Sequence, residues 1–226
     1  MLRKLCFKTI LHQEMYQSAR KLKTVYRYMD DKKNLESFLE GKIRISTLGA
    51  CRAYENQEKG DCDEGKEVYR VSQMTDEDPN FHKKANKLGM SFEACYGTTI
   101  TNCRSETYLP NGFVLCATAR RDDEKFSKDF GEFCLKINDG ERFFQLVSRA
   151  IREKYDLLGG HHEKVIYNPQ YYEDDELPPG KIGFVKRPKY EWQEEYRFLW
   201  LPKDLNIEKF LMVDVPDIKH LCEHVL

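Results

Sequence analysis

The front of the chain alternates hydrophobic and polar positions with a period of two. Residues 24–29 (TVYRYM) are rich in β-branched and aromatic side chains, which predicts a strand. Its alternation places Tyr26 and Tyr28 on one face and Arg27 on the other. Apolar residues at helical spacing, ended by a glycine, then predict a short helix over residues 32–40.

Most later segments also have the strand period. The turn at residues 110–112 (PNG) predicts a hairpin between the strands on either side of it. Asn138, followed three residues later by Glu141, predicts the start of the longest helix, which ends before residues 159–160. Further strands are predicted over residues 43–47, 98–107, 113–118, 132–137, 164–167, 182–186, 195–201 and 210–215. We therefore expect an α+β fold with a mixed, mostly antiparallel sheet and a few flanking helices.

The hydrophobic pattern fades between residues 53 and 87. This stretch holds Gly, Asp, Lys and Glu but few residues of the buried type. A loop of this length inside a compact domain is uncommon and usually serves as a lid or a connector. Because no low-complexity segment divides the chain, we expect one domain over residues 1–226 with a long mobile insertion at about 53–87.

Charge and cysteine content narrow the class of protein. The chain has 37 Lys and Arg against 38 Asp and Glu, so no overall basic field draws it to nucleic acid or to anionic lipid. Its N-terminal apolar runs are too short and too polar for a signal peptide or a membrane span. Eight cysteines are dispersed singly, which favours reduced thiols. We expect a cytoplasmic protein without a membrane partner.

Residues 189–198 (KYEWQEEYRF) carry the sharpest cluster of candidate chemistry, because a polar turn leads directly into an aromatic strand. The strand period places Glu195 and Arg197 on one face with Gln193, and the aromatic residues on the other. The aromatic face belongs in the core, so the polar face points outward or into a cleft. There Glu195 could bind a ligand, or it could form with Arg197 a surface ion pair that contributes little to stability.

Three of these features resemble the motifs of ADP-ribosyltransferases of the Arg–Ser–Glu class. Gln193-x-Glu195 resembles the Q-x-E form of the turn motif of that class. Arg27 in a strand and Ser46-Thr47 at the end of the next strand resemble the other two motifs, in the same order. Over most of its length, in segments such as LESFLEGKIRISTL and KRPKYEWQEEYRF, the chain also resembles a widespread uncharacterised family of bacterial and phage domains.

The first resemblance implies an ADP-ribosyltransferase-like fold and an enzyme with NAD as co-substrate. It would be a mono-ADP-ribosyltransferase or an NAD glycohydrolase, acting in conflict between bacteria and phages and held in check by an inhibitory partner protein. Glu195 would bind the ribose beside the positive charge that develops as nicotinamide leaves, and Arg27 would hold a pyrophosphate oxygen. Gln193 would meet the acceptor, a protein or a nucleic acid. The other residues expected to bind NAD or a related nucleotide are Tyr28, Ser46, Thr47 and Arg52.

Two other functions stay open on the sequence. The same scaffold could be a non-catalytic module that binds a nucleotide or a partner protein through Arg27, Arg52 and the acidic loop at residues 61–64. This acidic loop, with Glu55, also offers hard oxygen donors of the kind that hold Mg²⁺ or Ca²⁺ in a metal-dependent nuclease. Its spacing does not match a calcium-binding loop, so we favour a solvated acidic loop and expect no metal.

Overall fold

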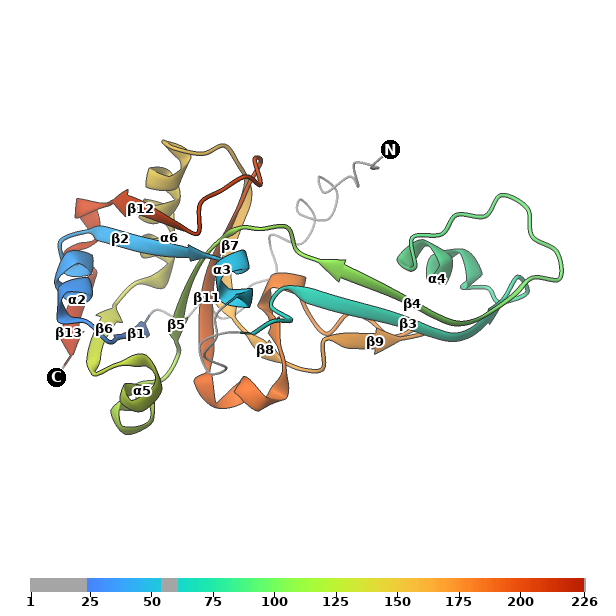
Figure 1. Ribbon diagram of the computed structural model, residues 1–226, viewed down its shortest axis with the longest axis horizontal. Helices are drawn as coiled ribbons and strands as arrows, with labels where there is room; N and C mark the ends of the chain where they lie inside the picture. Colours follow the sequence, from blue (N-terminus) through green and yellow to red (C-terminus); the bar gives the residue numbers. More distant parts are fainter. Residues whose placement is uncertain (1–23, 54–60, 226) are drawn as a thin grey trace.

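The computed structural model describes residues 24–53 and 61–225, which form a main body and an arm that projects from it (Figure 1). The strands of the main body are β1 (Val25–Met29), β2 (Lys42–Thr47), β5 (Phe113–Thr118), β6 (Phe133–Ile137), β7 (Leu157–Lys164), β11 (Glu195–Pro202), β12 (Phe210–Asp214) and β13 (Cys222–Val225). They form one sheet in the order β12-β2-β5-β1-β6-β13, with β11 pairing β5 and β7 pairing β11. Every pairing in this sheet is antiparallel, which confirms the α+β class with a mostly antiparallel sheet.

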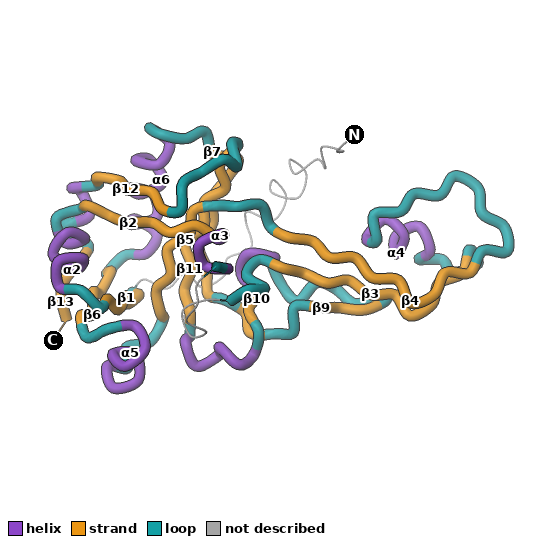
Figure 2. Tube along the Cα trace, in the orientation of Figure 1, coloured by secondary structure: helices purple, strands orange, loops and turns teal. Residues whose placement is uncertain are grey.

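Helices lie around the main sheet and at the end of the arm (Figure 2). They are α2 (Lys32–Leu39), α3 (Leu48–Arg52), α4 (Phe81–Lys87), α5 (Asp123–Phe130) and α6 (Gly140–Arg152), with three short 3-10 turns, η1 (Ile182–Phe184), η2 (Pro188–Gln193) and η3 (Pro216–Ile218). None of the helices within residues 24–53 and 61–225 combines the length and the apolar character needed to cross a membrane.

The main core packs α2 and α6 against the sheet. Phe143 of α6 stacks on Phe38 of α2 with ring centroids 5.9 Å apart, and both side chains are buried. The predicted helix start is one residue early, because Asp139 rather than Asn138 accepts the capping hydrogen bond, from Arg142 N at 2.9 Å. The helix also ends earlier than predicted, because the segment with the two glycines becomes β7 and pairs with β11.

The residues from 66 to 108 form the arm, and here the structure corrects two predictions. β3 (Lys66–Thr75) pairs with β4 (Thr99–Tyr108) and β9 (Tyr171–Glu173), and α4 packs on this three-stranded sheet. Residues 66–87 are therefore a strand and a helix rather than a long loop; residues 54–60 of the expected insertion lie outside the described residues. The arm has its own small core around Tyr69, Val71, Met74, Phe81 and Tyr172.

The second correction concerns the predicted hairpin at residues 110–112. β4 pairs with β3 in the arm, whereas β5 pairs with β11 in the main sheet, so the turn carries the chain from the arm to the body. Its contacts explain its position: the carbonyl of Gly112 accepts from Leu48 N at 2.9 Å, and Asn111 Oδ1 accepts from Gly49 N at 2.9 Å. The turn is thus tied to α3 rather than to a neighbouring pair of strands.

One edge of β5 is divided between two partners. The other edge of β5 pairs with β11 along its whole length. On the divided edge, Phe113 and Val114 pair with β2, and only Thr118 pairs with β1. β1 and β2 therefore separate beside the middle of β5, and they leave a gap in the sheet.

Candidate functional site

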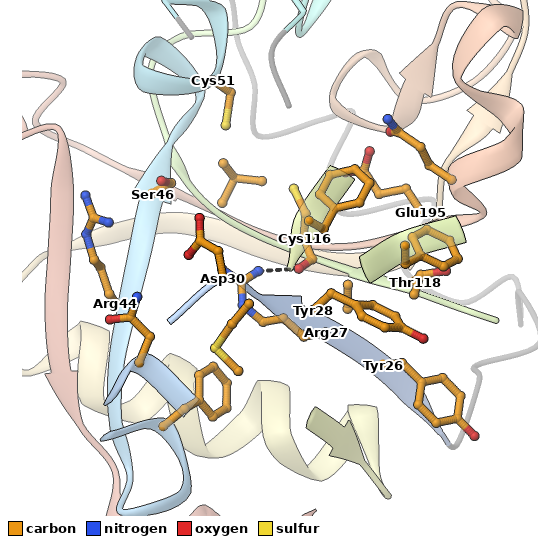
Figure 3. A pocket seen from close by; sticks show the side chains of 18 of the residues that line it. Tyr26, Arg27, Tyr28, Asp30, Arg44, Ser46, Cys51, Cys116, Thr118 and Glu195 are labelled. Carbon is orange, nitrogen blue, oxygen red and sulfur yellow. Dashed lines mark hydrogen bonds between the residues drawn. The ribbon is translucent and has the colours of Figure 1, made fainter. Parts of the chain in front are cut away.

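A cavity of about 460 Å³ opens where β1 and β2 separate from β5 (Figure 3). The exposed residues that line it form what we call the mouth: Asp30, Asn34, Lys42, Arg44 and Met212. Three buried polar residues form what we call the floor: Lys186 of β10 (Val185–Lys186), Gln193 of η2 and Glu195 of β11. β10 pairs with β8 (Ile166–Tyr167) beside the main sheet. The cavity thus leads from the exposed side of α2 and β2 to the start of β11.

Four buried charged side chains meet at the floor. Glu195 accepts from Lys186 Nζ at 3.0 Å through Oε2, and from Arg197 Nε at 2.8 Å and Nη2 at 2.7 Å through Oε1. Arg197 is only 1% exposed, and its Nη1 also donates to Glu64 Oε1 at 2.6 Å and to the carbonyl of Gly183 at 2.7 Å. We call Glu64, Lys186, Glu195 and Arg197 the charge cluster. Two cations balance two carboxylates, so every buried charge in it has a partner of opposite sign.

The charge cluster fixes the ionisation of Glu195. Burial by itself raises the pKa of this carboxyl, but the charges of Arg197 and Lys186 outweigh burial and lower the pKa to about 2. Burial lowers the pKa of Lys186, and here the charges of Glu195 and Glu64 outweigh it and raise the pKa above its ordinary value. At neutral pH the floor therefore presents an ionised carboxylate held between an ammonium and a guanidinium.

Arg27 occupies the gap in the sheet. Its Nη1 donates to the carbonyl of Cys116, in the part of β5 that lies between the residues paired with β2 and with β1. Burial lowers the pKa of the guanidinium, although an arginine stays protonated in proteins. Arg44, on β2, lines the cavity from the exposed side. Arg27 thus brings a positive charge into the cavity, and Arg44 brings one to the mouth, where its guanidinium lies 4.5 Å from the centroid of the Phe210 ring.

Aromatic side chains form one wall of the cavity. Tyr26, Tyr28, Phe126 and Phe130 line it. Tyr28 stacks on Phe126 with centroids 5.1 Å apart, and the Tyr28 hydroxyl accepts from the backbone N–H of Asp122 at 3.1 Å. Flat apolar surfaces beside cations suit a ligand that carries both rings and phosphates.

Five of the residues expected from the sequence line this one cavity, although they belong to three segments that lie far apart along the chain. Figure 3 shows Arg27, Tyr28, Ser46 and Glu195 around the same space, and Gln193 also lines it. They come from three parts of the fold, because the divided edge of β5 brings β1, β2 and the start of β11 together.

Two expected nucleotide-binding residues do not line the cavity. Thr47 points to the opposite face of β2 from Ser46, and its Oγ1 caps α3 by accepting from Ala50 N at 3.1 Å. Arg52 donates from Nε to the carbonyl of Glu64 at 2.7 Å and from Nη2 to the carbonyl of Leu109 at 2.9 Å. Both residues hold loops in place, and the structure does not bring them to this cavity.

The sequence interpretation missed most of the charge cluster. The sequence predicts a solvated acidic loop around Glu64, but Glu64 is 4% exposed, and Asp61 is 2% exposed. The surface pair that the strand pattern allowed for Glu195 and Arg197 is also wrong, because both residues are buried. One feature of the sequence indicates the charge cluster. Arg197 lies within an aromatic strand, where it is expected to be buried, and a buried cation needs buried carboxylates as partners.

The carboxylates of the acidic loop at residues 61–64 lie close to several cations. The ligand atoms of Asp61, Cys62 and Asp63 lie within 4.8 Å of one another. Asp61, however, pairs with Arg187, and Asp63 lies 3.2 Å from Arg187 Nη1 and 3.5 Å from Lys66 Nζ.

Comparisons of the chain with protein-family models, with curated proteins and with solved structures found no match. The function of the cavity must therefore be inferred from its own residues.

Proposed function

We propose that the cavity binds NAD and that the protein cleaves the bond between nicotinamide and ribose, as an ADP-ribosyltransferase or an NAD glycohydrolase. One observation carries the proposal. Arg27, Ser46 and the Gln193–Glu195 pair, which resemble the three motifs of the Arg–Ser–Glu class, line a single cavity between diverging strands. This convergence also supports an ADP-ribosyltransferase-like fold.

The lining residues suit each part of a dinucleotide. Arg27 and Arg44 can hold the diphosphate, since a guanidinium forms paired, charge-assisted hydrogen bonds with phosphate oxygens. Tyr26 and Phe130 are partly exposed and offer ring faces for stacking. The volume of about 460 Å³ is in the range of small-ligand sites.

The floor supplies the chemistry that the reaction needs. When nicotinamide leaves, the electron pair of the C–N bond goes to its ring nitrogen and the ribose becomes oxocarbenium-like. The ionised carboxylate of Glu195 accepts a hydrogen bond from a ribose hydroxyl and stabilises the developing positive charge. Lys186 and Arg197 keep that carboxylate in a fixed position, which lowers the cost of reorganisation during the reaction.

One observation favours a second function, a non-catalytic module that binds a nucleotide. Both carboxylate oxygens of Glu195 already accept hydrogen bonds from Lys186 or Arg197. A carboxylate neutralised in this way offers less negative charge to a transition state than a free one. A binding module predicts that NAD stabilises the protein against heat without forming nicotinamide.

Nicotinamide release from NAD by the purified protein tests the proposal. We expect release by the wild type and a loss of release, with NAD binding retained, in Glu195→Gln. Because Glu195 belongs to the charge cluster, Arg44→Ala serves as a second variant: Arg44 is exposed, and its loss should raise KM for NAD. Arg104→Ala, which removes an exposed arginine of the arm, is the matched control and should leave release unchanged. A thermal shift with NAD but no nicotinamide would establish the binding module instead.

A further inference from the structure

Building on the proposed function, we infer that the acceptor of the ADP-ribose is water, so that the protein acts as an NAD glycohydrolase. An acceptor residue of a macromolecule would have to reach the ribose beside Glu195. The turn that carries Gln193 and the burial of the floor keep a residue of a macromolecule away from that ribose. A water molecule can still reach the ribose.

The amide expected to meet an acceptor is directed inward. Gln193 is 5% exposed, and its Oε1 accepts a hydrogen bond from Lys186 Nζ at 2.8 Å. An amide that recognises a macromolecule must present its polar atoms at the surface. In this structure the Gln193 side chain instead supports the ammonium that pairs with Glu195.

The turn around Gln193 is held on both sides. Before it, the Trp192 ring packs on Phe126 and Phe130 of α5, with centroids 5.6 and 5.9 Å apart. After it, the carbonyl of Glu194 accepts from Ala119 N at 2.8 Å, just beyond the end of β5. An acceptor chain would have to break both contacts to enter from this side.

The most exposed part of the cavity lining is on other elements than the floor. Among the described residues, the exposed ones that line the cavity belong to the mouth, at the end of β1, on α2, on β2 or on β12, while Glu195 is 5% exposed at the floor. An NAD molecule with its nicotinamide ribose at Glu195 extends toward the mouth and fills the space between the mouth and the floor. Only a small nucleophile then has access to the reacting carbon.

The reaction balances with water alone. The bond between the ribose carbon and the nicotinamide nitrogen breaks, and its electron pair neutralises the positive ring. A water oxygen forms the new bond to that carbon, and one proton is released to solvent. Each turnover therefore gives one nicotinamide and one ADP-ribose, and no redox partner is needed.

A product balance tests the inference. The purified protein is incubated with NAD labelled in its adenylate part, with and without total cellular protein and nucleic acid, and in a third reaction with methanol. We expect equal amounts of nicotinamide and free ADP-ribose in the first two reactions, with no label on macromolecules. Methanol should yield methyl ADP-ribose, because it is small enough to reach the floor. Label on a macromolecule, with nicotinamide in excess over ADP-ribose, would overturn the inference and leave the proposed function standing.

Gln193→Ala provides an independent readout. Because Gln193 contacts Lys186 and no acceptor, its loss should lower nicotinamide and ADP-ribose formation in the same proportion. A selective loss of macromolecular labelling in this variant would show that Gln193 meets an acceptor. If the wild type releases no nicotinamide in any reaction, the proposed function fails and this inference fails with it.

Discussion

Glu64→Gln is the change that most directly tests the charge cluster. Glu64 accepts from Arg197 Nη1 at 2.6 Å and from Nη2 at 3.3 Å, and the two side chains are 5% and 1% exposed. Glutamine has nearly the same shape but no charge. The variant would therefore leave the buried Arg197 with the Glu195 carboxylate as its one anionic partner, beside the neutral carbonyl of Gly183 and the amide oxygen of the new glutamine.

The expected loss of stability is large. Removing one partner of a buried ion pair costs about 3–5 kcal/mol, because the remaining charge has lost its compensation. Glutamine keeps one hydrogen-bond acceptor, so we expect about 3 kcal/mol, at the lower end of that range. For a chain of this size, such a loss lowers Tm by about 6–12 °C.

Urea unfolding at neutral pH, followed by circular dichroism, measures this loss. The matched control is Glu106→Gln on the arm, because Glu106 pairs with Arg104 and Lys66 but is partly exposed to solvent. Its loss should cost less than about 1 kcal/mol. If Glu64→Gln lowers the free energy of unfolding no more than Glu106→Gln does, Glu64 does not form the buried ion pair with Arg197. The charges at the floor would then be paired in another way.

Three further predictions address the rest of the molecule. The pKa of Glu195 is about 2 in the folded protein and 4.5 ordinarily, so its ionised form stabilises the fold above about pH 4.5. That contribution should be lost as pH falls from 4.5 toward 2; urea midpoints should drop across this range, and Glu195→Gln should show a smaller drop. Thr47→Ala removes the cap of α3 and should lower the free energy of unfolding by about 1 kcal/mol while the kcat for nicotinamide release stays unchanged, whereas Ser46→Ala should reduce release. A lower kcat in Thr47→Ala would place Thr47 in the site. Phe81→Ala opens the core of the arm, so hydrogen–deuterium exchange should rise across residues 66–108 and stay unchanged in β5; a rise in β5 would show that arm and body unfold together.

The strand period predicts the parts of the site that depend on local pattern. The alternation over β11 is confirmed: Tyr196, Phe198 and Trp200 lie in the main core, and Glu195 lies on the other face. β1 lines the cavity with Tyr26 and Tyr28 as well as with Arg27, so the alternation does not set one face of this strand apart as the cavity face. A period of two is set by the backbone and can be read from a single segment.

The gap in the sheet could not be predicted in this way, because it depends on pairing between distant segments. Nothing in residues 113–118 shows that β2 takes one end of β5 and β1 the other. The partners of Lys186 and Glu64 depend on the same long-range arrangement. The strand period predicts β4 of the arm but not β3, because the buried positions of β3 are interrupted by polar ones.

A crystal structure of Glu195→Gln with NAD tests the central claim most directly, because the variant should bind NAD without cleaving it. We predict NAD in the cavity between β1 and β2, with the diphosphate at Arg27 and Arg44 and the nicotinamide ribose within hydrogen-bonding distance of residue 195. NAD bound elsewhere, or a cavity that stays empty at saturating NAD, would contradict the assignment of this cavity as the NAD site.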